Sequence, residues 1–456
     1  MIGEEPRGRN LLRFRPVAAI ARSRFYPAVL QWVSAAFFAV IVWQLMLGPE
    51  SAHDNLGTAL TWVLWWPLIP IVFLLLGRFW CAVCPFGWLQ DQVQKLVAVN
   101  KPVPAFLKRY GIWIIDASFI FITWADHVWG IVESPWGSGL LLLTMTTLVV
   151  GTAAFFQRRT FCRYLCFLGG VAGNYARTGM VALRADAEVC KTCTSRAACF
   201  NGTATTAPCP VFEFPRTMDS NANCNLCASC VKSCPHGAIT LTVRPPTREL
   251  WFIRKPKLSE SMLAMAIMGI VLVQNVTMLG FWEDILAWLE QTTGTTSYAV
   301  NYTIAFTVAI SLPVCLLLLA SRGAAFLGHG TTRQQFTSFG YALIPLDIAA
   351  HIAHNLFHLL AEGKSIFVTG LALIGREHGE GSAAVVGTDT IQVLQYAVLA
   401  LGVAGSIYTA YRIAAARSER QPRVMRPLLL APYASLILVL AGLNVWLFAL
   451  PMAHRM

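Results

Sequence analysis

Cysteine is the residue type whose spacing most clearly indicates chemistry, because all but one of the 13 cysteines lie in closely spaced groups. One group ends in Cys-Pro and reads Cys224-x2-Cys227-x2-Cys230-x3-Cys234-Pro235. This is the spacing of bacterial ferredoxins, in which thiolates hold a cubane 4Fe-4S cluster and the last cysteine of a run ligates the neighbouring cluster. A stretched run of the same order precedes it and reads Cys190-x2-Cys193-x5-Cys199-x9-Cys209-Pro210. The two runs predict two 4Fe-4S clusters.

The exchange of fourth ligands between the two runs predicts which cysteines share a cluster. The first cluster would be held by Cys190, Cys193, Cys199 and Cys234, and the second by Cys209, Cys224, Cys227 and Cys230. Structural zinc is one alternative, but zinc ribbons pair two Cys-x2-Cys knuckles without a third cysteine and a closing Cys-Pro. Disulfides are the other alternative, and they are rare where a cytoplasm keeps thiols reduced. Membrane topology therefore bears on the choice.

The composition is that of an integral membrane protein. Hydrophobic residues make up 56% of the chain and charged residues only 13%, whereas a soluble domain is about one quarter charged. Nine apolar stretches are long enough to cross about 30 Å of hydrocarbon, at residues 26–48, 57–79, 110–131, 138–156, 259–281, 299–321, 338–361, 390–412 and 427–451. They are expected to be helices, because they lack the alternation of a barrel strand. The predicted fold class is an all-α integral membrane protein of about nine transmembrane helices with an inserted α+β, ferredoxin-like, two-cluster domain.

Basic residues in the short loops predict the orientation of these helices. Alternate ends of the spans carry Lys and Arg, namely Arg7, Arg9, Arg13, Arg15, Arg22, Arg24, Lys95, Lys101, Lys108, Arg109, Arg158, Arg159, Arg254, Lys255, Lys257, Arg322, Arg333, Arg412, Arg417, Arg420, Arg423 and Arg426. The intervening loops at 49–56, 132–137 and 282–298 carry acids but no Lys or Arg, and only the sparsely charged loop at 362–389 gives no support. Because the charge follows loop parity, the net charge of +12 does not indicate nucleic-acid binding.

The expected location is the bacterial cytoplasmic (inner) membrane, as a multi-pass protein with a cytoplasmic N-terminus and ferredoxin domain and a periplasmic C-terminus. Four domains are predicted in sequence order. They are a basic cytoplasmic N-terminus at 1–25, a four-helix membrane unit with border cysteine pairs at 26–180, the two-cluster ferredoxin domain at 181–250, and a five-helix membrane unit at 251–456.

Two further cysteine pairs lie at predicted membrane borders. Cys81 and Cys84 follow the second span, and Cys162 and Cys166 follow the fourth. Because both spans end on the inner face, the four thiols can meet just below the hydrocarbon, each pair sharing one helix face at i, i+3 or i, i+4. A tetrathiolate iron or iron-sulfur site is feasible there, and buried free cysteines acting as small hydrophobes are the alternative. The remaining cysteine, Cys315, is expected in the core of the sixth span.

With these cysteines the sequence resembles the NapH-like and NosR-like membrane polyferredoxins, which combine a Cys-x3-Cys-Pro after each of two helices with a cytoplasmic two-cluster ferredoxin domain. The matching stretches are 77–87, 159–166 and 190–235, within residues 25–250. The resemblance implies electron exchange between the quinone pool and a redox partner, or electron supply for metalloenzyme maturation. The chain departs from the pattern, because only two residues separate Cys81 and Cys84, Phe167 replaces a proline, and five spans follow the ferredoxin segment.

The C-terminal half contains one row of ionisable residues at membrane depth. Four of them fall on one helical stripe at i, i+4, i+7 and i+11, namely Asp347, His351, His354 and His358. Such residues are costly in a bilayer and usually face a proton path, a ligand or the bundle interior. The stripe is therefore a candidate for b-type haem, a metal ion or a quinone pocket with proton-accepting histidines, with hydrogen-bonded packing histidines as the alternative. A haem would need a second ligand from another helix, for which His127 is the candidate, and Asp116 is a candidate for a proton route.

These features predict a membrane-bound iron-sulfur protein that passes electrons between quinone or quinol and a cytoplasmic or membrane redox partner. Such a chain would be the electron-transfer subunit of a quinol dehydrogenase or of a quinone-reducing oxidoreductase. Two alternatives remain open at this point. One is an accessory protein that supplies electrons for metalloenzyme maturation, and the other is a redox-coupled ion transporter.

Overall fold

The computed structural model describes residues 8–97, 99–195, 198–327, 330–376, 383–417 and 425–450. These residues are mostly helical and contain one two-stranded sheet. Three arginines of the orientation argument, Arg7, Arg420 and Arg423, lie outside the described residues. The same holds for residues 377–382 of the loop at 362–389 and for the C-terminus from residue 451.

Eight helical segments in the described part of the chain are long and apolar enough to cross a membrane. They are Ala28–Leu47, Leu56–Leu96, Pro135–Phe155, Leu258–Thr277, Tyr298–Phe326, Thr332–Ala361, Thr388–Arg417 and Pro427–Ala449. The ninth expected span, 110–131, is also helical and forms most of α7 (Ala105–Trp129). It is not among the eight, and it carries Asp116, Asp126 and His127.

The second of these segments is a series of short helices rather than one rod. It contains α3 (Leu56–Thr58), the π-helix η2 (Ala59–Trp65), α4 (Trp66–Leu76), the 3-10 turn η3 (Gly77–Phe79), α5 (Trp80–Val83) and α6 (Pro85–Leu96). Gly77 bends the chain with a φ of 61°, a conformation that costs glycine little. Cys84 is extended, with a ψ of 133°, because a residue before proline is disfavoured in the helical region. These two breaks shape the border where Cys81 and Cys84 lie.

The chain forms two compact units, whose boundaries pass through helices rather than between them. The first unit comprises Met1–Trp43, Ile71–Ile115 and Gly139–Glu249, and the second comprises Gln44–Pro70, Asp116–Ser138 and Leu250–Met456. The elements divided between the units are α2 (Ala28–Leu47), α4, α7, α8 (Pro135–Phe155) and the 3-10 turn η4 (Arg248–Phe252). Four domains were expected from the sequence. Of their boundaries, only the one near residue 250 coincides with a boundary between these units.

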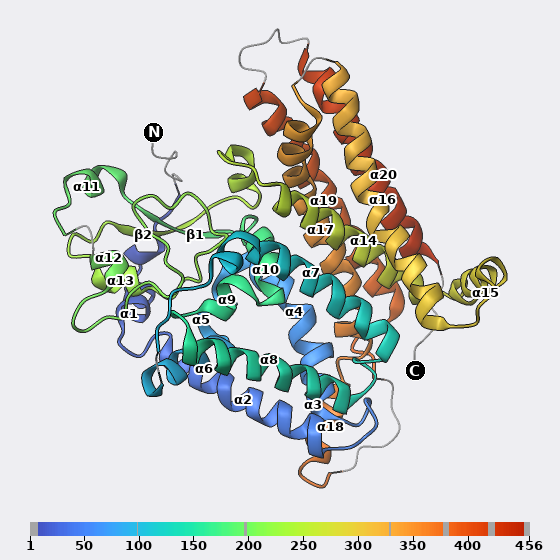
Figure 1. Ribbon diagram of the computed structural model, residues 1–456, viewed down its shortest axis with the longest axis horizontal. Helices are drawn as coiled ribbons and strands as arrows, with labels where there is room; N and C mark the ends of the chain where they lie inside the picture. Colours follow the sequence, from blue (N-terminus) through green and yellow to red (C-terminus); the bar gives the residue numbers. More distant parts are fainter. Residues whose placement is uncertain are drawn as a thin grey trace. The chain divides into compact units, whose positions relative to one another are not determined.

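The first unit adds a small α+β segment to its membrane helices. Its remaining elements are η1 (Leu11–Arg13), α1 (Arg15–Arg22), α9 (Thr160–Tyr164), α10 (Phe167–Ala176), β1 (Val181–Ala185), α11 (Ala187–Thr192), α12 (Ala198–Asn201), α13 (Ser229–Ser233) and β2 (Ile239–Val243). β1 and β2 pair antiparallel, with Leu183 opposite Leu241 (Figure 1). The sheet holds the two cysteine runs together, because they lie on the connection between its strands.

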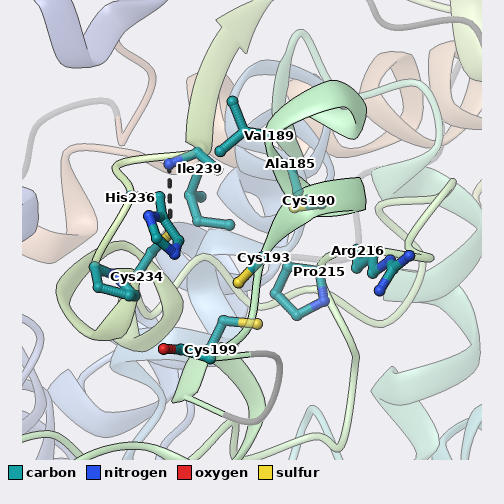
Figure 2. Close-up of a pocket in the computed structure, with 13 residues that line it drawn as sticks. Ala185, Val189, Cys190, Cys193, Cys199, Pro215, Arg216, Cys234, His236 and Ile239 are labelled. Atoms are coloured by element: carbon teal, nitrogen blue, oxygen red, sulfur yellow. Dashed lines mark hydrogen bonds between the residues drawn. The ribbon is translucent and has the colours of Figure 1, made fainter.

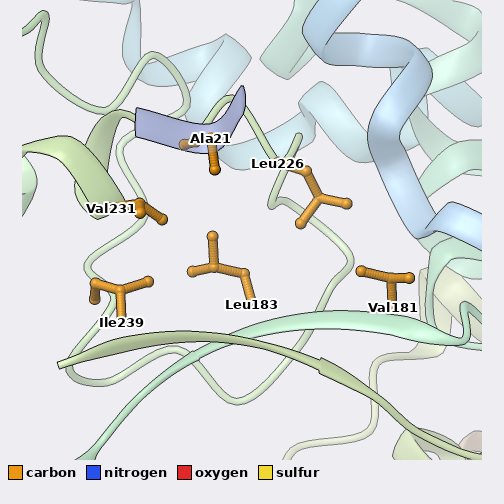
Figure 3. Packing of buried hydrophobic residues seen from close by; sticks show 7 residues of the cluster. Ala21, Val181, Leu183, Leu226, Val231 and Ile239 are labelled. Carbon is orange, nitrogen blue, oxygen red and sulfur yellow. The ribbon is translucent and has the colours of Figure 1, made fainter. Parts of the chain in front are cut away.

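A small apolar core covers one face of this sheet (Figure 3). Its buried members are Ala21, Val181, Leu183, Leu226, Ala228, Val231 and Ile239. Ala21 comes from α1, and Asn10 forms a β-bridge to Thr242, so the basic N-terminal segment packs on this sheet. Burying these side chains removes apolar surface from water, which stabilises the fold by about 25 cal/mol for each Å² buried. The core thereby fixes the loop that carries Cys224, Cys227 and Cys230.

The second unit contains a bundle of long helices (Figure 1). They are α14 (Leu258–Thr277), α16 (Tyr298–Phe326), α17 (Thr332–Ala361), α19 (Thr388–Arg417) and α20 (Met425–Ala449), and the shorter α15 (Trp282–Thr293) and α18 (Ser365–Ala372) accompany them. α17 packs against α14, α16, α19 and α20. Small residues allow the closest approach, because a Cβ added at Gly402 of α19 would lie 2.4 Å from the Cβ of Ala349. The middle of α17 is therefore deeply buried.

Candidate functional site

The structure places four of the predicted ligands around one pocket. Cys190 lies in α11, Cys193 directly after it, Cys199 in α12 and Cys234 directly after α13, and all four line this pocket (Figure 2). Ala185, Val189 and Ile239 complete its apolar wall. Cys234 belongs to the second run in the sequence but lies beside the first run in space. That placement is the one expected from the exchange of fourth ligands in two-cluster ferredoxins.

The other four cysteines of the two runs lie within electrostatic range of one another. They are Cys209, Cys224, Cys227 and Cys230. The loop that carries Cys224 and Cys227 curls tightly, since Leu226 and Ala228 both have a positive φ, of 56° and 60°. Non-glycine residues adopt this conformation rarely, and it clusters at functional sites. Cys230 also lies within electrostatic range of Cys199, so the two sets of thiols are neighbours.

Burial favours the neutral form of Cys199 and Cys224 in the protein alone. Burial, together with a smaller contribution from neighbouring thiols, raises the pKa of Cys199 to about 11 and that of Cys224 to about 12. Thiolate is the form that binds iron, so loading iron must release protons here. Backbone N–H groups favour the loaded form, because Ala238 N donates to Cys234 Sγ at 3.3 Å. The donor set and the apolar lining therefore fit iron-sulfur clusters.

No three His, Cys, Asp or Glu side chains in the described part of the chain are placed to hold a single metal ion. A tetrahedral zinc site would bring its sulfurs close together, since each Zn–S bond is only about 2.3 Å long. A cubane separates its four cysteines by the width of the inorganic core.

The border cysteines gather into a third set, but each pair spans a helix break instead of sharing a helix face. Cys84 is the N-cap of α6 and Cys166 is the N-cap of α10, both in extended conformations. The expectation of one helix face for each pair was therefore wrong. For the first pair the reason is Pro85, and in the second the chain breaks at the same place although Phe167 replaces the proline. Helix N-termini carry partial positive charge and stabilise thiolates.

All four border thiols lie within electrostatic range of one another, and buried cations surround them. Arg78 Nε donates to Cys81 Sγ at 3.3 Å, and Gln90 Nε2 donates to Cys162 Sγ at 2.9 Å. Burial raises the pKa of Cys162, although the Arg159 guanidinium beside it opposes that shift. These donors and charges favour an anionic sulfur-ligated centre at this position.

Arg159 is held in place by a bidentate ion pair with Asp91, at 3.0 and 2.6 Å. Gly87 leaves room for it, because a Cβ there would lie 1.9 Å from Arg159 Nη1. A planar guanidinium paired in this way is a rigid donor. It is therefore preorganised to face Cys162.

The three groups of cysteines are called the first ferredoxin set (Cys190, Cys193, Cys199 and Cys234), the second ferredoxin set (Cys209, Cys224, Cys227 and Cys230) and the border set (Cys81, Cys84, Cys162 and Cys166). Two arginines connect the border set with the second ferredoxin set. Arg78 Nη1 donates to Ala222 O at 2.5 Å, two residues before Cys224. Arg158 Nε donates to Cys209 O at 3.0 Å, and its guanidinium lies 4.2 Å from the ring centroid of Phe212. The thiols thus follow the order of first ferredoxin set, second ferredoxin set and border set. Such an order suits a relay of electron carriers.

A buried carboxylate braces this part of the first unit. Burial alone would raise the pKa of Glu249, but three arginines, Arg244, Arg184 and Arg177, hold it below its usual value. The distances from their nitrogens to the Glu249 oxygens are 2.9, 3.0 and 3.2 Å. Arg184 also lies within electrostatic range of Cys224. The Glu249 network therefore positions one more cation beside the second ferredoxin set.

The histidine stripe lies in the second unit and is buried as a row along α17. Asp347 is fully buried, and neither of its carboxylate oxygens has a hydrogen-bond partner among the described residues. The ring centroid of His351 lies 5.8 Å from that of Trp66, and His354 Nδ1 lies 2.7 Å from Asn275 Oδ1. The row continues to His358, whose ring centroid lies 5.3 Å from that of His354.

His127 lies beside other residues of the second unit. Its Nε2 is 3.4 Å from Thr277 Oγ1, and its ring stacks on Tyr302 with a centroid separation of 4.9 Å. Cys315 is exposed on α16 and not in the core as expected. A thiol on the apolar outer face of a membrane helix would meet lipid.

Several functional candidates were not found from the sequence. Arg78 and Arg159 each stand three residues before the first cysteine of a border pair, so the repeated Arg-x2-Cys was an available signal. Glu260 and Tyr341 were also missed, although Glu260 lies within the expected span 259–281, where an ionisable residue is costly. Tyr341 Oη donates to Glu260 Oε2 at 2.6 Å.

Comparison with known protein families gives a match to the two segments that contain the border cysteines. The model of a 4Fe-4S binding domain matches residues 58–104 and 138–181, which contain Cys81, Cys84, Cys162 and Cys166. The match supports an iron-sulfur, ferredoxin-type family and suggests iron-sulfur electron transfer. No curated protein and no solved structure matches the chain.

Proposed function

We propose that this protein passes electrons between the membrane quinone pool and a redox partner. Two 4Fe-4S clusters in the ferredoxin segment and a further iron-sulfur centre at the border cysteines would serve as one-electron carriers. The observation that carries the proposal is the border set. Its four thiols come from both segments matched by the 4Fe-4S family model, and buried Arg78 and Arg159 face them.

The chain's own residues would perform three tasks in this function. The cysteines hold iron, apolar residues line part of the pocket around Cys190, and burial shields Cys224 from water. Arg78 and Arg158 fix the border set against the second ferredoxin set. The partner would receive or donate electrons at the first ferredoxin set, because it lies farthest along the order of thiols from the membrane border.

The proposed membrane arrangement keeps nine spans, with α7 as the ninth. Eight apolar helices and the basic loops support a multi-pass protein of the bacterial inner membrane, with the ferredoxin segment in the cytoplasm and the C-terminus in the periplasm. The resemblance to NapH-like and NosR-like polyferredoxins supports the quinone as the membrane reactant. It describes the first unit better than the second.

The histidine stripe is proposed as the quinone site. Quinone chemistry needs groups that exchange protons near neutral pH, and imidazole is such a group. Haem b at this place would require His127 to face a stripe histidine across the porphyrin. His127 contacts Thr277, Tyr302 and Asp126, whereas His354 contacts Asn275 and His358, so the described contacts place different residues beside the two imidazoles. This difference favours quinone over haem.

Anaerobic purification with iron, sulfide and haem quantification tests the cofactors. We expect about 12 irons per chain, since three cubanes hold four each, together with EPR signals of reduced clusters and no haem absorption. About 8 irons would leave the border cysteines without a cluster. Zinc in place of iron would overturn the proposal. A quinol analogue added to the oxidised protein then tests the quinone, because bleaching of cluster absorption requires electron transfer.

A further inference from the structure

We propose that the second unit contains a path for protons along α17, which runs from Glu260 and Tyr341 through Asp347 to the histidine row and Glu362. The proposal rests on the proposed function, because it assigns a route to the protons of quinone chemistry. It also gives a role to the C-terminal half of the chain, which the resemblance to polyferredoxins does not describe.

One end of the path is a hydrogen-bonded cluster. Lys257 Nζ lies 3.0 Å from Glu260 Oε1, and Tyr341 Oη donates to Glu260 Oε2 at 2.6 Å. The side chain of Glu260 is 10% exposed and that of Lys257 is 60% exposed, so the cluster is buried but open on one side. Asp116 of α7 lies within electrostatic range of Glu260. This end faces the cytoplasm in the proposed orientation.

The other end is also open. His358 Nδ1 lies 3.4 Å from Glu362 Oε1, and their side chains are 31% and 32% exposed. Between the two ends, Asp347, His351 and His354 are 0%, 5% and 6% exposed. Tyr341 and His358 are 17 residues apart in one helix, which corresponds to about 25 Å at 1.5 Å per residue. This distance covers most of a bilayer core, which is about 30 Å thick.

A purely structural role does not explain why an aspartate occupies position 347. It is completely buried, and neither of its oxygens has a hydrogen-bond partner in the described part of the chain. An ionised carboxylate left alone in such a place costs several kcal/mol. A packing role would be served better by an apolar side chain. A carboxyl group that takes up and releases a proton explains both the residue type and its place in the row.

The longest gap in the row coincides with a break in helix hydrogen bonding. Tyr341 and Asp347 are six residues apart, or about 9 Å, and Pro345 lies between them. Proline has no N–H to donate to the carbonyl of Tyr341, four residues earlier. Ser406 Oγ of α19 accepts from Leu346 N at 2.9 Å, and the buried Thr409 hydroxyl lies one turn farther along α19. Polar groups beside such a break are the setting in which water bridges neighbouring carriers.

The chemistry balances with the clusters as electron acceptors. When a quinol is oxidised, its two O–H bonds break, its two protons enter the row at the histidines, and its two electrons pass singly to oxidised iron-sulfur centres. Quinone reduction is the reverse, and the row then delivers both protons. In either direction the row moves protons, while the cysteine-ligated centres move electrons.

Infrared difference spectroscopy on the full-length protein in proteoliposomes tests the path without any quinone. We expect a protonated-carboxyl band that disappears in Asp347→Asn, shifts in deuterium oxide, and changes when the clusters are reduced electrochemically. Glu260→Gln should slow deuterium exchange of this band at least 10-fold. Asp284→Asn, which changes an exposed carboxylate on α15, is the matched control and should leave the band unchanged. A band that neither exchanges nor responds to reduction would overturn the proposal.

Quinol-driven cluster reduction provides the second measurement. Removing a positioned proton carrier typically slows such a step by about 10²-fold or more, so Asp347→Asn should slow bleaching by quinol. Reduction by dithionite should stay unchanged, and Asp347→Glu should restore part of the rate. If quinol reduces the wild type and the Asn variant equally fast, the path is wrong although the proposed function stands. If quinol does not reduce the wild type, the quinone assignment fails, and the infrared result alone decides the path.

Discussion

The two compact units differ in how several of their buried charged residues are paired. In the first unit, the buried Arg159 and Glu249 are paired with Asp91 and with three arginines. In the second unit, the buried Asp116 and Asp347 have carboxylate oxygens without hydrogen-bond partners among the described residues. Paired charges hold a fixed arrangement, here one that surrounds sulfur ligands with cations. A buried carboxyl group without such partners is favoured in its neutral form, in which it can donate a proton. This difference matches the proposed roles, in which the first unit carries electrons and the second carries protons.

The largest expected effect comes from removing a ligand of the border set. Cys162→Ser should lower iron from about 12 to about 8 per chain and abolish cluster reduction by quinol, since the station nearest the membrane is lost. Iron and sulfide analysis with EPR measures both. Cys315→Ser is the matched control, because that exposed cysteine lies outside all three sets. If the Cys162 variant contained as much iron as the wild type, the proposal of an iron-sulfur centre at the border cysteines would be wrong.

The next effect tests whether the paired charges are structural. Glu249→Gln leaves three buried arginines without their carboxylate, and removing one partner of a buried pair costs about 3–5 kcal/mol. We expect a clearly lower unfolding midpoint by tryptophan fluorescence. Glu188→Gln, which breaks an exposed pair with Lys191, should change little. Equal midpoints for the two variants would mean that the Glu249 network does not brace the unit.

A smaller effect is expected on the potential of the border centre. Arg78→Gln removes a buried cation that donates to Cys81, and a hydrogen bond to a charged group contributes about 1.5–3 kcal/mol. For a one-electron couple this corresponds to a potential lower by about 60–130 mV. Arg78→Lys keeps the charge and should shift the potential less. Potentiometric EPR titration measures the difference, and an unmoved potential would leave Arg78 with a purely structural role.

The smallest effect concerns pH in protein freed of iron. Burial raises the pKa of Cys199 to about 11 and that of Cys224 to about 12, from an ordinary value of 9.0. Above pH 9 the unfolded chain therefore binds fewer protons than the folded one, and folding stability falls as the pH rises towards 12. The loaded protein should lack this loss, because its thiolates are bound to iron. Unfolding midpoints across this range check the difference, and parallel curves for both forms would contradict it.

The membrane helices were predictable from the sequence because hydrophobicity depends on composition alone. Eight of the nine expected spans are apolar helices of sufficient length, and the ninth, α7, is helical but carries Asp116 and Asp126. The same-face geometry of the border pairs was wrong. Periodicity within a helix cannot show that the helix ends at Cys84 and Cys166, where the chain becomes extended. The unit boundaries inside α2, α4, α7 and α8 could not be predicted either, because the sequence was divided into whole segments.

Cysteine spacing by itself indicated the type of chemistry, because the reach of neighbouring thiols around an inorganic core depends on the number of residues between them. The row on α17 was likewise visible as a helical stripe. Only the tertiary structure brought Arg78 to Ala222 and Glu260 to Tyr341, since these pairs are 144 and 81 residues apart in the sequence. The tertiary structure also decided which buried charges have partners, because pairing depends on which side chains meet in space.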